Sequence, residues 1–237
     1  MSIKAYFFIS ASILLSGLSC TQGLKGNGNV VSEERAISAF THLSLNGVFN
    51  VFINQGDNES VKIETDENLQ DIIETINKDN KLTIQWKDKV SVKKSTKMNV
   101  YVTVNHLDVL GIKGVGNVST TSALKTETME LSVSGVGNTS LEINSKTLTA
   151  DLSAVGNIEL KGTTDSADII AEGAGNLNAF DLIVKKLTLK VSGIGNTDVH
   201  AEEEINITSS GIGNVSYRGN AVVKNMDASG IGKVVKL

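Results

Sequence analysis

A four-residue phrase, Gly-x-Gly-Asn with small variations, returns seven times between Gly114 and Lys233. The copies begin at residues 114, 135, 154, 173, 193, 211 and 230, so neighbouring copies lie 18 to 21 residues apart. Between copies, apolar and polar residues alternate with a period of two, which is typical of strands. A strand-forming repeat of this length indicates a β-solenoid, whose coils bury their inner side chains against one another. We therefore predict an all-β fold, a right-handed parallel β-helix of about seven coils.

Aligning the copies on their asparagine separates apolar columns from polar ones. The columns seven, five and two residues before the asparagine, and the column one residue after it, are mostly apolar, and we expect all four to face the interior. The column two residues before contains Val115, Val136, Val155, Ala174, Ile194, Ile212 and Ile231. The column four residues before is polar and should face water; it contains Lys113, Ser134, Ser153, Glu172, Ser192, Ser210 and Ser229.

The glycine and asparagine of the phrase have a steric explanation. Glycine adopts positive φ without strain, and asparagine tolerates left-handed conformations better than most residues, so both suit a tight corner. Asparagines stacked in adjacent coils can also form an amide ladder. We interpret as structural corners Gly116, Asn117, Gly137, Asn138, Gly156, Asn157, Gly175, Asn176, Gly195, Asn196, Gly213 and Asn214.

A phosphate-binding or calcium-binding loop is the chemical alternative for a glycine-rich phrase. The phosphate loop requires Gly-x-x-x-x-Gly-Lys-Ser/Thr before a helix, which is not found here. Nine-residue calcium repeats carry Asp and have half this period. His42, His106 and His200 lie far apart without metal-ligand spacing. We therefore expect no cofactor and no metal.

Residues 30–113 are less regular and are expected to form a β cap and divergent coils, whereas residues 114–237 form the regular coils. Leu43–Ile53 resembles a coil in which Phe49 replaces a glycine. Glu67–Ile76 places apolar residues at helical spacing after Asp66, a candidate N-cap, so the cap is predicted to carry one short helix. Caps cover the unpaired edges at solenoid ends. At the other end, Lys233 and Lys236 are expected to blunt the final edge.

The N-terminus has the features of a bacterial export signal. Residues 1–19 contain Lys4 and an apolar run from Ala5 to Leu18, and Cys20, the only cysteine, follows. We predict lipidation of Cys20, with residues 20–29 as a lipid-tethered linker; ordinary signal cleavage is the alternative, because Gly17 stands where lipoboxes favour Leu. The predicted location is the cell envelope, as an outer-membrane lipoprotein facing the periplasm or the cell surface.

The repeated phrases, the segment 28–35 (GNVVSEER) and the segment 47–56 (GVFNVFINQG) together resemble the auto-transporter adhesin family named for its head GIN domain. The resemblance covers about residues 27–237, and we place the domain at residues 30–237. It implies a bacterial envelope protein with a right-handed parallel β-helix, without an established enzymatic activity or defined functional residues. Ala154, Ala174 and Lys233 depart from the phrase, and a corner tolerates all three.

We expect a non-catalytic binding or structural module of adhesin-like character, with an envelope glycan or protein as its partner. The formal net charge of −4 argues against nucleic acid. One basic stretch is a candidate contact patch for anionic lipid or glycan, with a solvated loop as the alternative. It contains Trp86, Lys87, Lys89, Lys93, Lys94 and Lys97.

Two further functions stay open. Polysaccharide lyases and hydrolases also use parallel β-helices, and glycoside hydrolysis requires a pair of carboxylates across the sugar. Asp151 and Asp168 come from adjacent coils and could form such a pair, and Asp165 and Asp181 precede their turns. The other alternative is a periplasmic partner of an envelope regulator.

Overall fold

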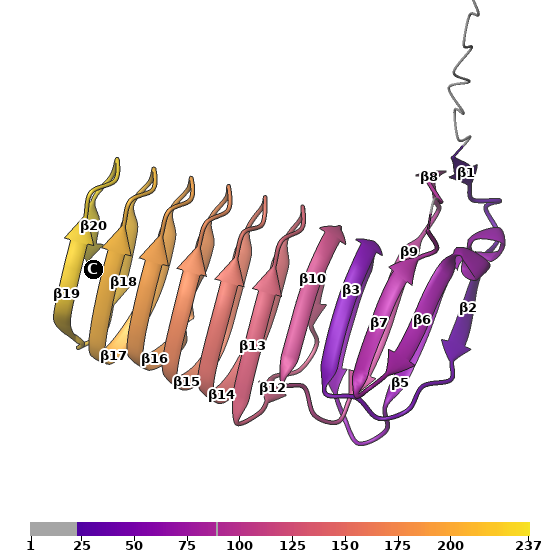
Figure 1. Ribbon diagram of the computed structural model, residues 1–237, viewed down its shortest axis with the longest axis horizontal. Helices are drawn as coiled ribbons and strands as arrows, with labels where there is room; N and C mark the ends of the chain where they lie inside the picture. Colours follow the sequence, from indigo (N-terminus) through magenta and orange to yellow (C-terminus); the bar gives the residue numbers. More distant parts are fainter. Residues whose placement is uncertain (1–22, 89) are drawn as a thin grey trace, which may run out of the picture.

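The computed structural model describes residues 23–88 and 90–237. Its strands wind around one long axis, up one wall, over an edge and down the other wall, and each coil lies beside the previous one (Figure 1). The winding is right-handed, and parallel pairing joins the regular coils. The predicted parallel β-solenoid is confirmed. The export signal, Cys20 and Lys89 lie outside the described residues. The described residues contain no helix long and apolar enough to cross a membrane.

The regular coils share one pattern, in which one to three strands run from one corner phrase to the next. Adjacent coils pair in parallel, as Leu148 with Ala167 and Leu187 with Ile205 illustrate, and the register shifts at a few positions. The strands are β10 (Val109–Val115), β11 (Val118–Thr120), β12 (Leu124–Lys125), β13 (Thr128–Val133), β14 (Thr139–Leu152), β15 (Ile158–Ala171), β16 (Leu177–Val191), β17 (Thr197–Ser209), β18 (Val215–Arg218), β19 (Val222–Ala228) and β20 (Val234–Lys236).

The core includes three of the four columns expected to face inward. The columns seven and five residues before the asparagine, and the column after it, are buried in every coil but the last, whose outer side no further coil covers. The polar column four residues before is exposed throughout, as predicted. In the last coil Met226 is 42% exposed.

The prediction that the column two residues before the asparagine faces inward is wrong. Val115, Val136 and Val155 are each about half exposed, at 49%, 50% and 51%. The reason is that the alternation of strand residues continues through the phrase. The two glycines take the inward positions between Ile112 and Val118, so the residue between them must point outward.

In the sequence the first coil interrupts the cap, because residues 24–35 of the cap precede it and residues 60–104 follow it, whereas in the stack it comes after the whole cap. This coil consists of β3 (His42–Val48) and β4 (Asn50–Gln55), with Phe49 buried in the inward position of the second glycine. The chain then leaves this coil to build the rest of the cap and returns as β10, which pairs with β3 on the side away from the cap. The cap contains β1 (Leu24–Lys25), β2 (Val30–Arg35), β5 (Ser60–Asp66), η1 (Glu67–Ile72), β6 (Ile73–Lys78), β7 (Lys81–Trp86), β8 (Val92–Lys94) and β9 (Met98–Val104).

The cap closes the stack with antiparallel strands. β7 and β9 pair with the first coil in parallel, whereas β6 pairs with β7, and β5 with both β9 and β2, in the antiparallel sense. The predicted helix is shorter than expected: a 3-10 helix ends at Ile72, and Ile73–Lys78 is a strand. The β-branched residues Ile73, Thr75 and Ile76 favour that strand once β7 offers an edge.

Asp66 does not cap this helix, because its side chain makes no capping hydrogen bond. Its fully buried carboxylate accepts hydrogen bonds from the Gly28 amide at 2.7 Å, the Thr96 amide at 2.6 Å and the Thr96 hydroxyl at 2.8 Å. Burial by itself would raise the pKa of Asp66, but these bonds outweigh it and lower the pKa below its usual range. Asp66 therefore holds the segments that contain Gly28 and Thr96 against the end of β5.

The predicted linker, residues 20–29, is hydrogen-bonded to the cap within its described residues 23–29. β1 pairs with β8, the Gly26 amide donates to the Lys94 carbonyl at 2.8 Å, and the Asn27 amide donates to Asn68 Oδ1 at 2.9 Å. The chain is thus hydrogen-bonded to the cap from its first described residues.

Candidate functional site

One edge of the solenoid carries all the corner phrases and presents two parallel rows of side chains. The outer row, which we call the aliphatic ridge, is joined by single parallel bridges between successive corners, and β3 supplies its first member. Its exposed fractions run from 42% at Val48 to 72% at Ile231. Eight rungs at about 4.8 Å span roughly 34 Å. The ridge consists of Val48, Val115, Val136, Val155, Ala174, Ile194, Ile212 and Ile231.

The second row is the column of asparagines, whose side chains form a ladder along the edge. The Oδ1 atom of one asparagine accepts a hydrogen bond from the backbone N–H of the asparagine in the next coil. The Asn138 amide donates to Asn117 Oδ1 at 3.1 Å, and the Asn196 amide donates to Asn176 Oδ1 at 3.0 Å. Between Asn157 and Asn176 the side-chain amide makes the bond, at 3.2 Å. None of these asparagines has positive φ, since Asp79 and Asn80 are the only described non-glycine residues that do. Their role at the corner is hydrogen bonding and not a left-handed conformation.

The second glycine of each phrase adopts the positive φ that the corner requires, from 133° at Gly156 to 150° at Gly232. A Cβ atom there would overlap the backbone of the preceding coil: at Gly175 it would meet the Gly156 carbonyl oxygen at well under 3.0 Å. The corners therefore need glycine for both its conformation and its close approach.

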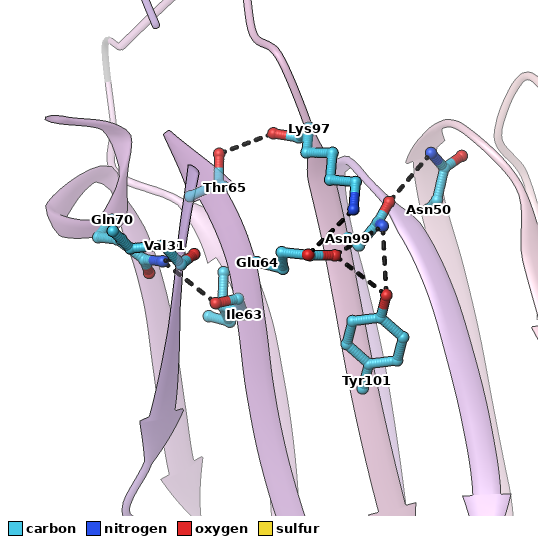
Figure 2. A network of polar contacts seen from close by, with 9 residues as sticks. All are labelled: Val31, Asn50, Ile63, Glu64, Thr65, Gln70, Lys97, Asn99 and Tyr101. Carbon is cyan, nitrogen blue, oxygen red and sulfur yellow. Dashed lines mark hydrogen bonds and ion pairs between the residues drawn. The ribbon is translucent and has the colours of Figure 1, made fainter. Parts of the chain in front are cut away.

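The asparagine ladder ends in a polar network at the cap. Figure 2 shows Lys97, Asn99 and Tyr101 converging on the Glu64 carboxylate, with bonds of 3.0, 3.1 and 3.1 Å, while Asn50 reaches Asn99 at 3.5 Å. The hydrogen bond from Lys97, and those from Asn99 and Tyr101, hold the pKa of Glu64 below its usual range against desolvation. The same bond raises the pKa of Lys97. Lys97 therefore forms an ion pair with Glu64 of the same chain.

The other residues of the basic stretch divide into two groups. Lys87, Lys93 and Lys94 are exposed, and no ion pair joins any of them to another described residue. Trp86 is half-buried and packs edge-on against Phe49, with ring centroids 6.3 Å apart. Its indole is thus a structural contact between the cap and the first coil.

Two of the four candidate wall aspartates share one depression. Asp151 and Asp168 line it together with Glu130, Ser132 and Thr149. Both aspartates are exposed. Asp165, in contrast, forms an ion pair with Lys185 at 2.6 Å, and Asp181 is exposed outside this depression.

Two of the three histidines pair with a nearby carboxylate. His106 pairs with Asp108 at 2.8 Å and His200 with Glu202 at 2.7 Å, whereas His42 begins β3. Within residues 23–88 and 90–237, no group of three or more His, Cys, Asp or Glu side chains is placed to hold a metal ion.

Two aromatic contacts on the wall were missed by the sequence analysis. Phe52 and Tyr101 stack at 5.1 Å, and Lys62 lies 4.8 Å from the Tyr101 centroid. Arg218 lies 3.9 Å from the Phe180 centroid. Strand alternation places Phe52 and Tyr101 outward. Their ring stacking, however, depends on the pairing of β4 with β9, which are far apart in the sequence.

Known proteins resemble this chain in family and fold. The family model described as "Putative auto-transporter adhesin, head GIN domain" matches residues 39–221. No curated protein matches the chain in sequence. A crystal structure of a "putative adhesin" from Bacteroides fragilis has a TM-score of 0.87 and 24% identity, covering 91% of this chain and 100% of that one. A "putative lipid binding protein" from Parabacteroides distasonis has a TM-score of 0.72 and 23% identity, with the same coverage.

A "putative adhesin" from Parabacteroides merdae is also similar, with a TM-score of 0.65 and 24% identity over 91% of this chain and 99% of that one. At such identities the similarity concerns the fold alone.

Proposed function

The chain belongs to the auto-transporter adhesin family with a head GIN domain, and on that premise we propose that it is a non-catalytic binding module of the bacterial cell envelope. In this proposal Cys20 carries the lipid anchor to the outer membrane. The solenoid walls then hold an envelope glycan or protein. The adhesin description of the family supports a binding role.

The observation that carries this proposal is the depression beside Asp151 and Asp168 in a wall of outward polar side chains. Binding sites are usually concave and place a few polar groups around an apolar floor. Here the partly exposed Ile170 supplies apolar surface, and Ser132 and Thr149 supply hydroxyl groups. Carboxylates and hydroxyls accept and donate the hydrogen bonds that a polyhydroxylated or amide-rich ligand needs.

The test is binding of the chain that begins at Thr21 to an array of envelope glycans and to envelope extracts. A Thr149→Trp variant fills the depression without touching the core, and Asn178→Trp, an exposed position outside the depression, is the matched control. We expect Thr149→Trp to lose the captured ligand while Asn178→Trp keeps it. Equal binding by both variants would refute this site.

The second candidate function is a polysaccharide hydrolase or lyase acting at the same depression, because three carboxylates share it. Glycoside hydrolysis requires two carboxyl groups that flank the scissile bond, and Asp151 and Asp168 are the candidate pair. Incubating captured glycans with the chain and with an Asp151→Asn, Asp168→Asn variant separates the two functions. Shortened products that only the unsubstituted chain makes would establish the enzyme.

The anchor has its own test. We expect a full-length chain expressed in a bacterial host to incorporate a labelled fatty acid and to fractionate with membranes, and Cys20→Ser to lose both properties. Incorporation that persists in Cys20→Ser would refute lipidation at this residue.

A further inference from the structure

The aliphatic ridge is unusual because a regular apolar row lies on the outside of the molecule. Its side chains are exposed at positions where a β-solenoid can accept almost any residue, since they point away from the core. Every member is nevertheless aliphatic, from Val48 to Ile231. Contiguous exposed apolar surface in a soluble domain indicates a contact with another molecule or with a membrane.

The rows beside the ridge are polar but mostly uncharged. On one side lies the asparagine ladder, and on the other the column of serines, in which only Lys113 and Glu172 carry charge. The opposite edge differs: its turns carry ion pairs between Lys146 and Glu127 and between Lys185 and Asp165. The solenoid thus has one charged edge and one edge that combines aliphatic groups with neutral hydrogen-bonding groups.

Positive charge gathers where the ridge meets the cap. The ribbon of β1 and β8 stands on the edge that carries the corners (Figure 1), and it contributes Lys25, Lys93 and Lys94 as exposed residues. A cleft lined by the segment Ser95–Asn99 also contacts Val48 and Val115 of the ridge, which fixes the two features side by side. Asp88 is the only acid between Lys87 and Lys97. Leu24, 40% exposed, adds an apolar side chain to this ribbon.

The start of the described chain lies in the same ribbon. Gly23 precedes β1 directly, so a chain of three further residues places Cys20 within about 11 Å of it. A lipid anchor at Cys20, which rests on the proposed function, would therefore emerge beside the ridge and the lysines.

We propose that this edge is the membrane-facing side of the protein and binds an anionic phospholipid bilayer. The aliphatic ridge enters the boundary between head groups and acyl chains, and the asparagines and serines beside it hydrogen-bond to head groups. Lys25, Lys87, Lys93 and Lys94 interact with the negative surface. This orientation lays the solenoid along the bilayer and leaves both walls free for a ligand.

The experiment uses the chain that begins at Thr21, which lacks cysteine and an acyl group, so membrane binding is measured without the anchor. Flotation compares vesicles of phosphatidylcholine with vesicles that also contain phosphatidylglycerol, at low and high salt. We expect binding to the anionic vesicles alone, weakened by salt, with no competition from inorganic phosphate.

Two variants locate the contact. The ridge variant combines Val136→Ser, Val155→Ser and Ile194→Ser, and the lysine variant combines Lys87→Gln, Lys93→Gln and Lys94→Gln. Each variant should bind the anionic vesicles with an affinity lower by roughly tenfold or more. Lys146→Gln, Lys185→Gln and Lys186→Gln remove the same charge from the opposite edge, and this control variant should bind like the parent chain. Circular dichroism verifies that each variant is folded.

A direct readout is a polarity-sensitive fluorophore on a single introduced cysteine. A probe at Val136→Cys should shift to shorter wavelength when anionic vesicles are added, and a probe at Thr149→Cys on the wall should not. Unchanged vesicle binding by the ridge variant, or no shift at position 136, would overturn the proposal. So would sedimentation of the parent chain as a dimer that the ridge variant abolishes, because the ridge would then bind a second copy.

Discussion

Replacing the second glycine of a central corner should destabilise the whole stack. Gly175 has φ of 148°, and a Cβ atom there would overlap the Gly156 carbonyl of the preceding coil. Two backbone bonds join these corners, from the Gly156 amide to the Ala174 carbonyl at 2.9 Å and from the Ala174 amide to the Ala154 carbonyl at 3.0 Å. The Gly175→Ala variant must therefore strain its backbone and push two coils apart.

The size of the effect follows from these two contributions. Holding a non-glycine residue in this region of φ costs roughly 1–3 kcal/mol. Weakening two backbone hydrogen bonds adds about 1 kcal/mol for each. We expect Gly175→Ala to lower the free energy of unfolding by about 3–5 kcal/mol, which is a large part of the usual stability of a domain.

The assay is equilibrium unfolding in urea, where such a loss lowers the midpoint by roughly 1–2 M. Circular dichroism reports the strands of all coils, whereas the single tryptophan, Trp86, reports the cap. Because coils of a solenoid contact mainly their neighbours, we expect the dichroism transition to shift further than the fluorescence transition.

The matched control is Gly111→Ala. A Cβ atom at Gly111 would have the Leu43 carbonyl oxygen, 3.9 Å away, as its nearest neighbour, and its φ needs no glycine. We expect this variant to keep or slightly raise the stability, because alanine restricts the unfolded chain. If Gly175→Ala unfolds at the same urea concentration as Gly111→Ala, close approach of the coils does not explain the glycines.

Three further predictions concern single residues. Asp66→Asn should cost about 2–4 kcal/mol at neutral pH, because it replaces a buried carboxylate that accepts three hydrogen bonds. Because folding lowers the pKa of Asp66, its carboxylate adds fully to the free energy of unfolding at pH values well above its ordinary pKa of 3.8, and this stabilisation is lost as the pH falls below that value. Urea unfolding between pH 3 and pH 7 should therefore show that acid lowers the stability of the variant less than that of the parent chain. Asn157→Ala should lower stability by about 1 kcal/mol, because it removes one rung of an exposed ladder, and a loss below measurement error would show that water replaces the rung. Val136→Asp should change stability by less than about 0.5 kcal/mol while Leu131→Asp prevents folding, as thermal unfolding can check; equal damage by both would mean that position 136 faces inward.

The sequence determined the features that depend on local alternation and on the period. A repeat near twenty residues defines the solenoid, because each coil must place its apolar columns on those of its neighbours. The buried columns that contain Leu131 and Val133, the exposed serine column and the stacked asparagines follow from that register alone. The outward direction of Val136 follows from the same alternation, once the glycines are counted as inward residues.

The tertiary structure decided what depends on pairs of segments far apart in the chain. Glu67–Ile76 has the spacing of a helix, but β7 offers an edge that extends Ile73–Lys78 into a strand. Asp66 stands where an N-cap would, but the approach of Gly28 and Thr96 gives its carboxylate other partners. The meeting of the aliphatic ridge with the β1–β8 ribbon is likewise decided by tertiary structure, because β1 pairs with a strand far from it in the sequence and the segment after β8 lies beside Val48 and Val115. Local patterns fix which way each side chain points, whereas contacts between distant segments are fixed only when the coils and the cap close on one another.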